Sequence, residues 1–287
     1  MLAIARGSMG AMDALTTLLK AIIMGIVEGL TEFLPVSSTG HLIVTDAVLR
    51  FSNSIGGERA AETFEIFIQL GAILAVAVFF ARDLLALLRR AVSEAGARRL
   101  LLHVLVAFVP AAAVGLLFSN EIKEALFSTR TVALALVIGG IVMLWVESRT
   151  HRADTTALES VRLPQAVIIG LAQVASLIPG MSRSASTLVG GLLAGLDRPT
   201  ALKFSFYLSI PTLGAATVYD FLKNLDSIQG SALPYFGVGL VVAFFVALVV
   251  VKYFLDYVGR RDLKPFAWYR IGAGIVLLSL TAAGVLS

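Results

Sequence analysis

Apolar residues fill most of the chain in long runs, and short polar stretches separate these runs. Six runs approach or reach the roughly 20 residues that a helix needs to cross a bilayer. They cover residues 63–81, 101–118, 131–146, 203–222, 235–254 and 268–286. Lipid offers no hydrogen-bond partner to an unpaired backbone group, so spanning segments of this kind form helices. We therefore expect an all-α integral membrane protein with six transmembrane helices.

Four shorter apolar runs come in two pairs, residues 15–34 with 41–51 and residues 164–178 with 184–196. Pro35 separates the members of the first pair, and Pro179-Gly180 separates the members of the second. Proline ends a helix because it lacks a backbone donor and clashes with the preceding turn. Irregular backbone at membrane depth is tolerated only inside protein or beside a wet cavity. The pattern predicts two re-entrant helix pairs.

The two halves of the chain resemble each other. Pro179 follows Pro35 by 144 residues, Phe204 follows Phe64 by 140, and Gly274 follows Gly140 by 134. These matches keep their order and nearly keep their offset, which favours an internal duplication within one membrane domain of residues 1–287. The repeat halves are about 13–150 and 160–287. Each half holds three full spans, so the second half is expected to be inverted, as in folds whose broken helices meet near the midplane.

Charged residues make up only 15% of the chain, while 58% of residues are hydrophobic, and the net charge is +4. A basic soluble protein would suggest nucleic acid as a partner, but here the arginines gather in short loops. Positive loops face the cytoplasm. The loop flanked by Arg82, Arg89, Arg90, Arg98 and Arg99 is therefore expected there, with both chain ends on the outer face. Cysteine is absent, which excludes disulfides and thiol catalysis.

Two carboxylates precede the first break. Glu28 and Glu32 are four residues apart, so they share one face of a helix and repel each other unless a cation joins them. Charged groups within a membrane are rare and usually functional. We interpret the pair as a site for a divalent metal or a substrate-bound cation. The alternative is a pair of protonated or interfacial structural groups.

Three consecutive hydroxyl residues and a histidine follow the same break: Ser37, Ser38, Thr39 and His41. One hydroxyl is needed to cap the next helix, because Ser and Thr accept the unpaired N–H groups of a first turn. We expect Ser38 to be the cap and His41 to lie within reach of it. A hydroxyl beside an imidazole offers a nucleophile and a proton carrier. A purely structural histidine is the alternative.

The second break carries Arg183 between Ser182 and Ser184, with Thr187 one turn further on. A guanidinium prefers planar oxyanions such as phosphate, and free N–H groups at a helix start add to that preference. The alternative is an arginine that only anchors the helix at the interface. Together the two breaks predict an anion site inside the membrane, suited to phosphoryl transfer on a lipid phosphate. A transporter of such a lipid shares the inverted repeat and the midplane site.

The stretch EGLTEFLPVSSTGH at residues 28–41 and PGMSRSAST at residues 179–187 resemble the two signature regions of undecaprenyl-diphosphate phosphatases, the bacitracin-resistance family. The resemblance extends over most of the chain and includes ETFEIFIQLGAILAV at residues 62–76. It implies hydrolysis of undecaprenyl diphosphate to the monophosphate lipid carrier of cell-wall synthesis. It also implies a multi-pass protein of the bacterial cytoplasmic membrane with its site open to the outer face, and a homodimer.

The resemblance assigns roles to the residues already singled out. Glu28 and Glu32 match the carboxylates that hold Mg²⁺ or Ca²⁺ and the diphosphate, and Glu32 belongs to the catalytic group. Ser38 and His41 match the nucleophile and the acid or base, with Ser38 favoured as the attacking group and His41 kept as the alternative. Arg183 matches the phosphate-binding group. The substrate-binding set is completed by Ser182, Ser184, Thr187, Ser37 and Thr39.

Overall fold

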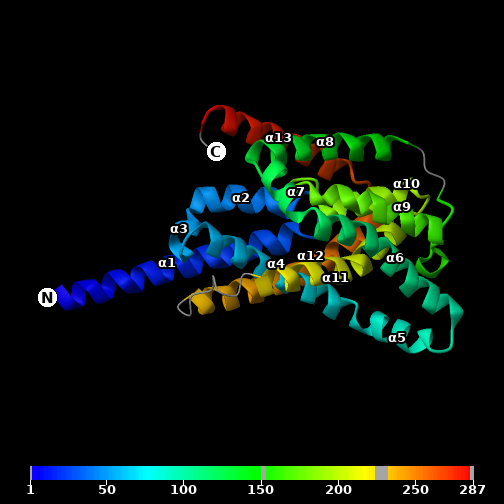
Figure 1. The fold of residues 1–287 in the computed structure, drawn as a ribbon, viewed down its shortest axis with the longest axis horizontal. Coiled ribbons are helices and arrows are strands. Elements are labelled where there is room, and N and C mark those ends of the chain that lie inside the picture. Colours follow the sequence, from blue (N-terminus) through cyan, green and yellow to red (C-terminus); the bar gives the residue numbers. More distant parts are fainter. Residues whose placement is uncertain (1, 150–152, 224–231, 285–287) are drawn as a thin grey trace.

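The computed structural model describes residues 2–149, 153–223 and 232–284, and in these ranges the chain is helical and contains no strand (Figure 1). The first half contains α1 (Leu2–Thr31), α2 (Ser38–Leu49), α3 (Phe51–Ile55), α4 (Glu58–Phe79), α5 (Ala81–Ala91), α6 (Ala95–Leu117), α7 (Ser119–Leu126) and α8 (Thr129–Ser148). The second half contains α9 (Leu163–Val174), α10 (Arg183–Leu193), α11 (Arg198–Lys223), α12 (Leu233–Arg260) and α13 (Lys264–Ala282). The predicted all-α class is confirmed.

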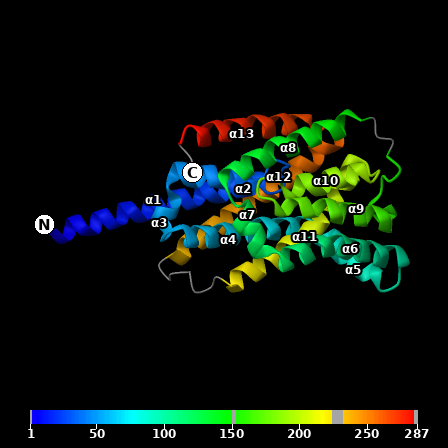
Figure 2. The ribbon, with the colours of Figure 1, turned by 45° about the horizontal axis from the view of Figure 1, so that its top comes forward.

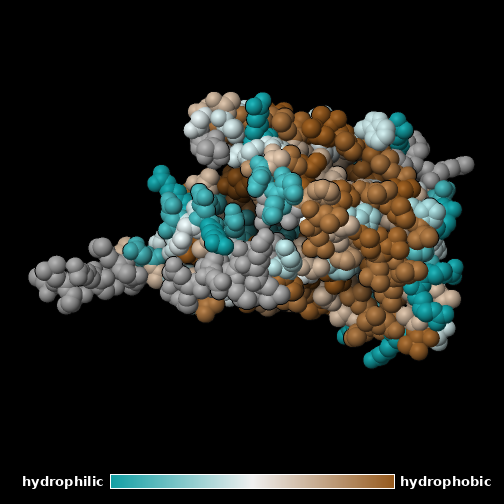
Figure 3. Space-filling model, in the orientation of Figure 1, coloured by the Kyte–Doolittle hydropathy of each residue, from teal (hydrophilic) through white to brown (hydrophobic). Residues whose placement is uncertain are grey.

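Within the part of the chain that the structure describes, six helices are long and apolar enough to cross a membrane. They are Met12–Thr31, Glu58–Phe79, Ala95–Leu117, Thr129–Ser148, Leu233–Arg260 and Lys264–Ala282. Figure 3 shows apolar side chains over the middle of the molecule, between polar groups toward its two ends. The predicted number of spanning helices is confirmed, and the chain is a multi-pass membrane protein.

Two helices differ from the predicted set of spans: α1 is a spanning helix that was not predicted, and α11 was predicted but is not one. The run at 15–34 is not a short segment, because α1 continues toward the N-terminus and reaches 30 residues. The run at 203–222 lies in α11, which is not among the apolar spans. Ser205 and Ser209 in the first part of α11 are fully buried, whereas Val218 and Tyr219 near its end are exposed. The first part of the helix is therefore enclosed by protein and tolerates a more polar sequence than a lipid-facing helix does.

Short helices do surround both predicted breaks. α2 has 12 residues, α9 has 12 and α10 has 11. α2 packs against α1, and α10 packs against α9. The first pair is thus one long and one short helix, whereas the second consists of two short helices. The re-entrant placement of the short helices in a bilayer stays a prediction.

Packing between the halves is reciprocal. α8 and α13 lie side by side in both ribbon views (Figures 1 and 2). A Cβ on Gly140 would meet the Ala267 carbonyl oxygen at 2.7 Å, and a Cβ on Gly274 would meet that of Ala133 at 2.7 Å. The pair of α1 with α12 likewise mirrors the pair of α9 with α6. A chain with an internal two-fold relation packs in this way; the duplication itself stays a prediction.

The turns before α2 and α10 match each other, but the second turn has one more residue between its proline and its N-cap. Ser37 and Ser182 are the N-caps, and both have left-handed backbone, with φ of 74° and 69°. They lie 145 residues apart, one more than the two prolines. The extra residue is accommodated at Gly180, whose φ is 92° and where a Cβ would lie 2.4 Å from the Val132 carbonyl oxygen. Only glycine fits this close approach.

Candidate active site

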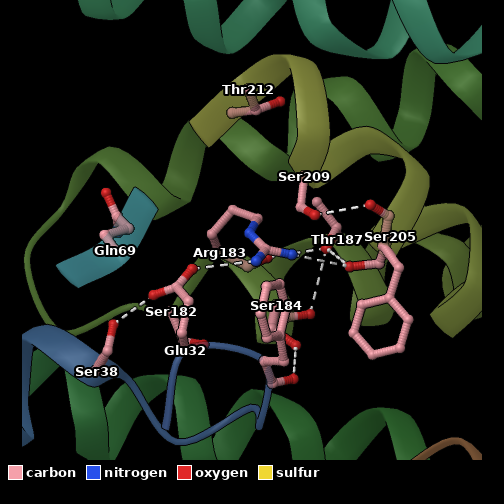
Figure 4. A network of polar contacts seen from close by, with 12 residues as sticks. Glu32, Ser38, Gln69, Ser182, Arg183, Ser184, Thr187, Ser205, Ser209 and Thr212 are labelled. Carbon is pink, nitrogen blue, oxygen red and sulfur yellow. Dashed lines mark hydrogen bonds and ion pairs between the residues drawn. The ribbon is translucent and has the colours of Figure 1, made fainter. Parts of the chain in front are cut away.

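The two breaks meet at an ion pair between Glu32 and Arg183 (Figure 4). The Glu32 Oε1 atom lies 3.1 Å from Arg183 Nη2, and both side chains are at least 90% buried. The Ser38 hydroxyl donates to Glu32 Oε2 over 2.7 Å. Glu32 lies just beyond the end of α1, Ser38 begins α2 and Arg183 begins α10. Segments about 150 residues apart in the sequence thus converge on one carboxylate, as the sequence predicted for the two breaks.

Arg183 keeps unused hydrogen-bond capacity. Its Nε atom is buried and has no partner among the described residues. Its Nη1 atom reaches Ser205 only at 3.5 Å. A guanidinium carries five N–H donors in a fixed fork that matches phosphate oxygens. A buried cation that shares its carboxylate with a serine can therefore accept a further anion.

The hydroxyls around Arg183 are mostly engaged by the protein itself. Ser184 donates to the Phe33 carbonyl oxygen over 2.7 Å. Thr187 bonds to the Arg183 carbonyl oxygen over 2.9 Å and to Ser205 over 2.6 Å. These contacts join α10 to α11 and to the turn after α1, so they shape the site. Ser182 accepts from the Ala185 N–H, which leaves its own O–H free to donate. Of the three predicted substrate-binding hydroxyls near Arg183, Ser182 is the one able to donate to a ligand.

The predicted contact between Ser38 and His41 is wrong, and so is the prediction that Ser38 is the cap. Ser37 is the N-cap of α2, and its side chain accepts from the Gly40 N–H. Ser38 is therefore the first helical residue and donates to Glu32, because a carboxylate is a stronger acceptor than an imidazole. Thr39 forms no side-chain hydrogen bond that the structure describes.

His41 is held by two other groups. Its Nδ1 atom lies 2.7 Å from the Ser37 carbonyl oxygen, and its Nε2 atom lies 2.6 Å from the Tyr269 hydroxyl. The His41 and Tyr269 rings also stack, with their centroids 5.6 Å apart. A ring nitrogen bonded to a phenol is well placed to move a proton, while the backbone contact orients the ring.

Glu28 is a buried carboxylate with one oxygen that has no hydrogen-bond partner among the described residues. Its side chain is 1% exposed, and its Oε1 atom has no partner within the described part of the chain. Both oxygens of Glu32, one turn later, are already engaged. An unpaired buried carboxylate oxygen is costly, which fits a cation at this point. The described residues contain no group of three acidic, histidine or cysteine side chains around one point, so a metal there would need further oxygen ligands from substrate or water.

One buried residue of the site was missed by the sequence reasoning. Arg270 on α13 is fully buried. It donates to the carbonyl oxygens of Pro35, Gly180 and Met181 over 3.0–3.2 Å, and also to that of Ala135. It therefore ties the turns before α2 and α10 to one helix. An arginine just inside an apolar span was the signal that could have found it, since ionisable groups there are rarely idle.

Comparison with known proteins places the chain within one family. The family model "Bacitracin resistance protein BacA" matches residues 21–276. A protein of Chromobacterium violaceum named "Undecaprenyl-diphosphatase 1" is 42% identical over 94% of this chain and 98% of its own length. One of the same name from Pseudomonas fluorescens is 47% identical over 92% of this chain and 94% of its own. "Undecaprenyl-diphosphatase" of Nitrosospira multiformis is 46% identical over 93% and 96%.

Proposed function

The chain belongs to the bacitracin resistance protein BacA family, and we propose that its Glu32–Arg183 site performs the hydrolysis named in its relatives. The enzyme is a membrane phosphatase that converts undecaprenyl diphosphate to undecaprenyl phosphate and inorganic phosphate. The observation that supports this site is the buried guanidinium of Arg183 with an unpaired Nε, beside a serine that donates to a carboxylate. The combination provides an anion clamp, a nucleophile and a proton acceptor in one enclosed place.

The geometry favours Ser38 as the attacking group and Glu32 as its base. The Ser38 Oγ atom attacks the terminal phosphorus, and its proton passes to Glu32 over the 2.7 Å hydrogen bond. The bond between that phosphorus and the bridging oxygen breaks, and the bridging oxygen leaves with the lipid phosphate. Arg183 balances the charge on the phosphoryl oxygens. Water then attacks the same phosphorus and releases inorganic phosphate, and Glu32 returns its proton to the Ser38 Oγ atom. His41 and Tyr269 provide a route for the proton of the attacking water.

A divalent cation such as Mg²⁺ or Ca²⁺ is also part of the proposal. Glu28 would hold it through its unpaired oxygen, and Glu32, four residues later, would be the second carboxylate. When bound, such an ion neutralises diphosphate charge and orients the phosphate groups. The phosphate-binding roles of Ser182, Ser37 and Thr39 belong to the same proposal.

The placement of the protein follows from its charges. Arg89, Arg90 and Arg98 lie around the connection between α5 and α6, at the end of the molecule away from the N-terminus (Figure 1). We place that end in the cytoplasm of a bacterial cell. A location in the inner membrane and a site open to the outer face, both implied by the sequence resemblance, belong to the same proposal. A homodimer, implied by the sequence resemblance, stays a prediction.

The experiment is release of inorganic phosphate from undecaprenyl diphosphate by the purified protein in detergent, with and without a chelator. We expect turnover that chelation abolishes and that added Mg²⁺ or Ca²⁺ restores. A lipid transporter would bind the diphosphate but release no phosphate. If the chelator does not change turnover, the metal part of the proposal is wrong, but the phosphatase activity still stands.

A further inference from the structure

A second polar hollow lies between the start of α6 and the start of α9. It has a volume of about 460 Å³, and its lining includes Arg99, His103, Glu159, Ser160, Arg162 and Leu163. α9 leads from this hollow toward the turn that precedes Arg183, and its 12 residues extend about 18 Å at 1.5 Å per residue. The hollow is therefore separate from the catalytic site.

The hollow is positively charged. Neither Arg99 nor Arg162 forms an ion pair with a carboxylate among the described residues, and Arg99 donates only to the Ala95 carbonyl oxygen at 3.4 Å. Glu159 is the acidic residue of the lining, and Arg90 holds it with two hydrogen bonds of 2.8 and 3.0 Å while also pairing with Glu94. Arg90 thus balances one of these two carboxylates, and Arg99 with Arg162 exceeds the charge of the other, so the group as a whole remains positive and attracts an anion.

A buried histidine also lines this space. His103 is 7% exposed and belongs to the lining of the hollow. An imidazole can hydrogen-bond to a polar ligand through a ring nitrogen. The buried ring, with the two arginines, distinguishes the hollow from an ordinary basic surface.

The hollow lies beside the apolar helices α6 and α9. Leu163 lines the hollow and is 49% exposed, and Leu102, next to His103 in sequence, is 54% exposed. Both helices are apolar beyond these residues. A free phosphate ion would make no use of these apolar residues, whereas acyl chains would cover them.

We propose that this hollow binds the phosphate group of an anionic membrane phospholipid. Arg99 and Arg162 pair with the phosphate oxygens, and Ser160 and His103 hydrogen-bond to the headgroup. The acyl chains lie against Leu102 and Leu163. The site sits at the arginine-rich end of the molecule and is independent of the phosphatase reaction.

The proposal is tested by native mass spectrometry of the full-length protein in detergent, titrated with phosphatidylglycerol or with phosphatidylcholine. Arg99→Gln and Arg162→Gln remove charge from the hollow. Arg98→Gln is the matched control, because Arg98 is exposed and adjacent in sequence but does not line the hollow. We expect phosphatidylglycerol to bind more tightly than phosphatidylcholine. Each hollow variant should weaken phosphatidylglycerol binding at least fivefold, and the control less than twofold.

Two outcomes would overturn the proposal. Equal losses in all three variants would show general attraction of an anionic lipid to a basic surface. Displacement of the lipid by millimolar inorganic phosphate would assign the hollow to the free ion instead. Phosphate release from undecaprenyl diphosphate is measured in parallel, and unchanged turnover in the variants verifies that each of them is folded.

Discussion

Arg183 is a buried cation with donor capacity that the described residues do not use, since its Nε atom has no partner among them. Its ion-pair partner Glu32 also accepts from Ser38. The residue begins α10, where the helix dipole disfavours a cation. Both facts make sense when a phosphate completes the site. A lysine at this position would keep the charge but lose the planar fork.

We predict that Arg183→Lys lowers turnover by on the order of 10²–10³-fold, the usual cost of losing a charge-assisted contact in an enclosed site. Thermal stability in detergent should stay near that of the wild type. Arg198→Lys is the control, because Arg198 pairs with Glu147 outside the site. Turnover of Arg183→Lys within about twofold of the wild type would show that Arg183 only anchors its helix.

Ser38 is predicted to carry the phosphoryl group during turnover, because it is the hydroxyl that donates to Glu32. Rapid quenching after addition of undecaprenyl diphosphate, followed by mass spectrometry, should locate phosphate on Ser38. Ser38→Ala should abolish both the adduct and turnover. Phosphohistidine at His41 would reverse the roles of the two residues.

Glu28 carries an unpaired buried oxygen, so removing its charge relieves a cost in the empty protein. We predict that Glu28→Gln melts at the same temperature as the wild type or higher, and that its turnover falls at least 10²-fold. The dependence of the residual turnover on added Mg²⁺ should be weaker than in the wild type. If turnover and its dependence on Mg²⁺ are both unchanged, Glu28 does not bind the metal.

At the scale of elements, the turns before α2 and α10 are held by contacts between helices. Arg270 on α13 reaches the carbonyl oxygens of both turns across α8, and Gly139 provides the space for it. A Cβ on Gly139 would lie 2.2 Å from Arg270 Nη2 and 2.9 Å from Cζ. Because Gly139 on α8 has no side chain, Arg270 on α13 has room to hold the two turns.

We predict that Gly139→Ala lowers stability by about 1–3 kcal/mol, as overpacking does, and that turnover falls with it because both turns shift. Gly272→Ala on α13 is the matched control, since a Cβ there meets nothing within 4 Å. The control should be as stable as the wild type or more so, because alanine favours helix over glycine. Melting temperatures in detergent, measured with turnover, make the comparison. Equal behaviour of the two variants would contradict the proposed role of Gly139.

At the scale of the whole molecule, orientation follows from where the arginines gather. The connection between α5 and α6 includes exposed Ser93, and the chain contains no cysteine. A Ser93→Cys protein should resist a membrane-impermeant thiol reagent in intact cells and react after lysis. Reaction in intact cells would invert the topology. Phosphatase activity confirms that the variant is folded.

The sequence by itself determined the class of the protein and the identity of the chemical groups. Apolar runs, prolines and in-membrane charges are local features, so they predicted a helical membrane protein and two polar breaks with Glu32, Ser38 and Arg183. The contacts between these groups were decided only by tertiary structure. The shift of the cap to Ser37 sends Ser38 to Glu32 and His41 to Tyr269, which is 228 residues away. The burial of the α11 serines and the contacts of Arg270 likewise depend on helices that meet only in the folded chain. Contacts between helices far apart in the sequence produce no periodic pattern from which they could be predicted.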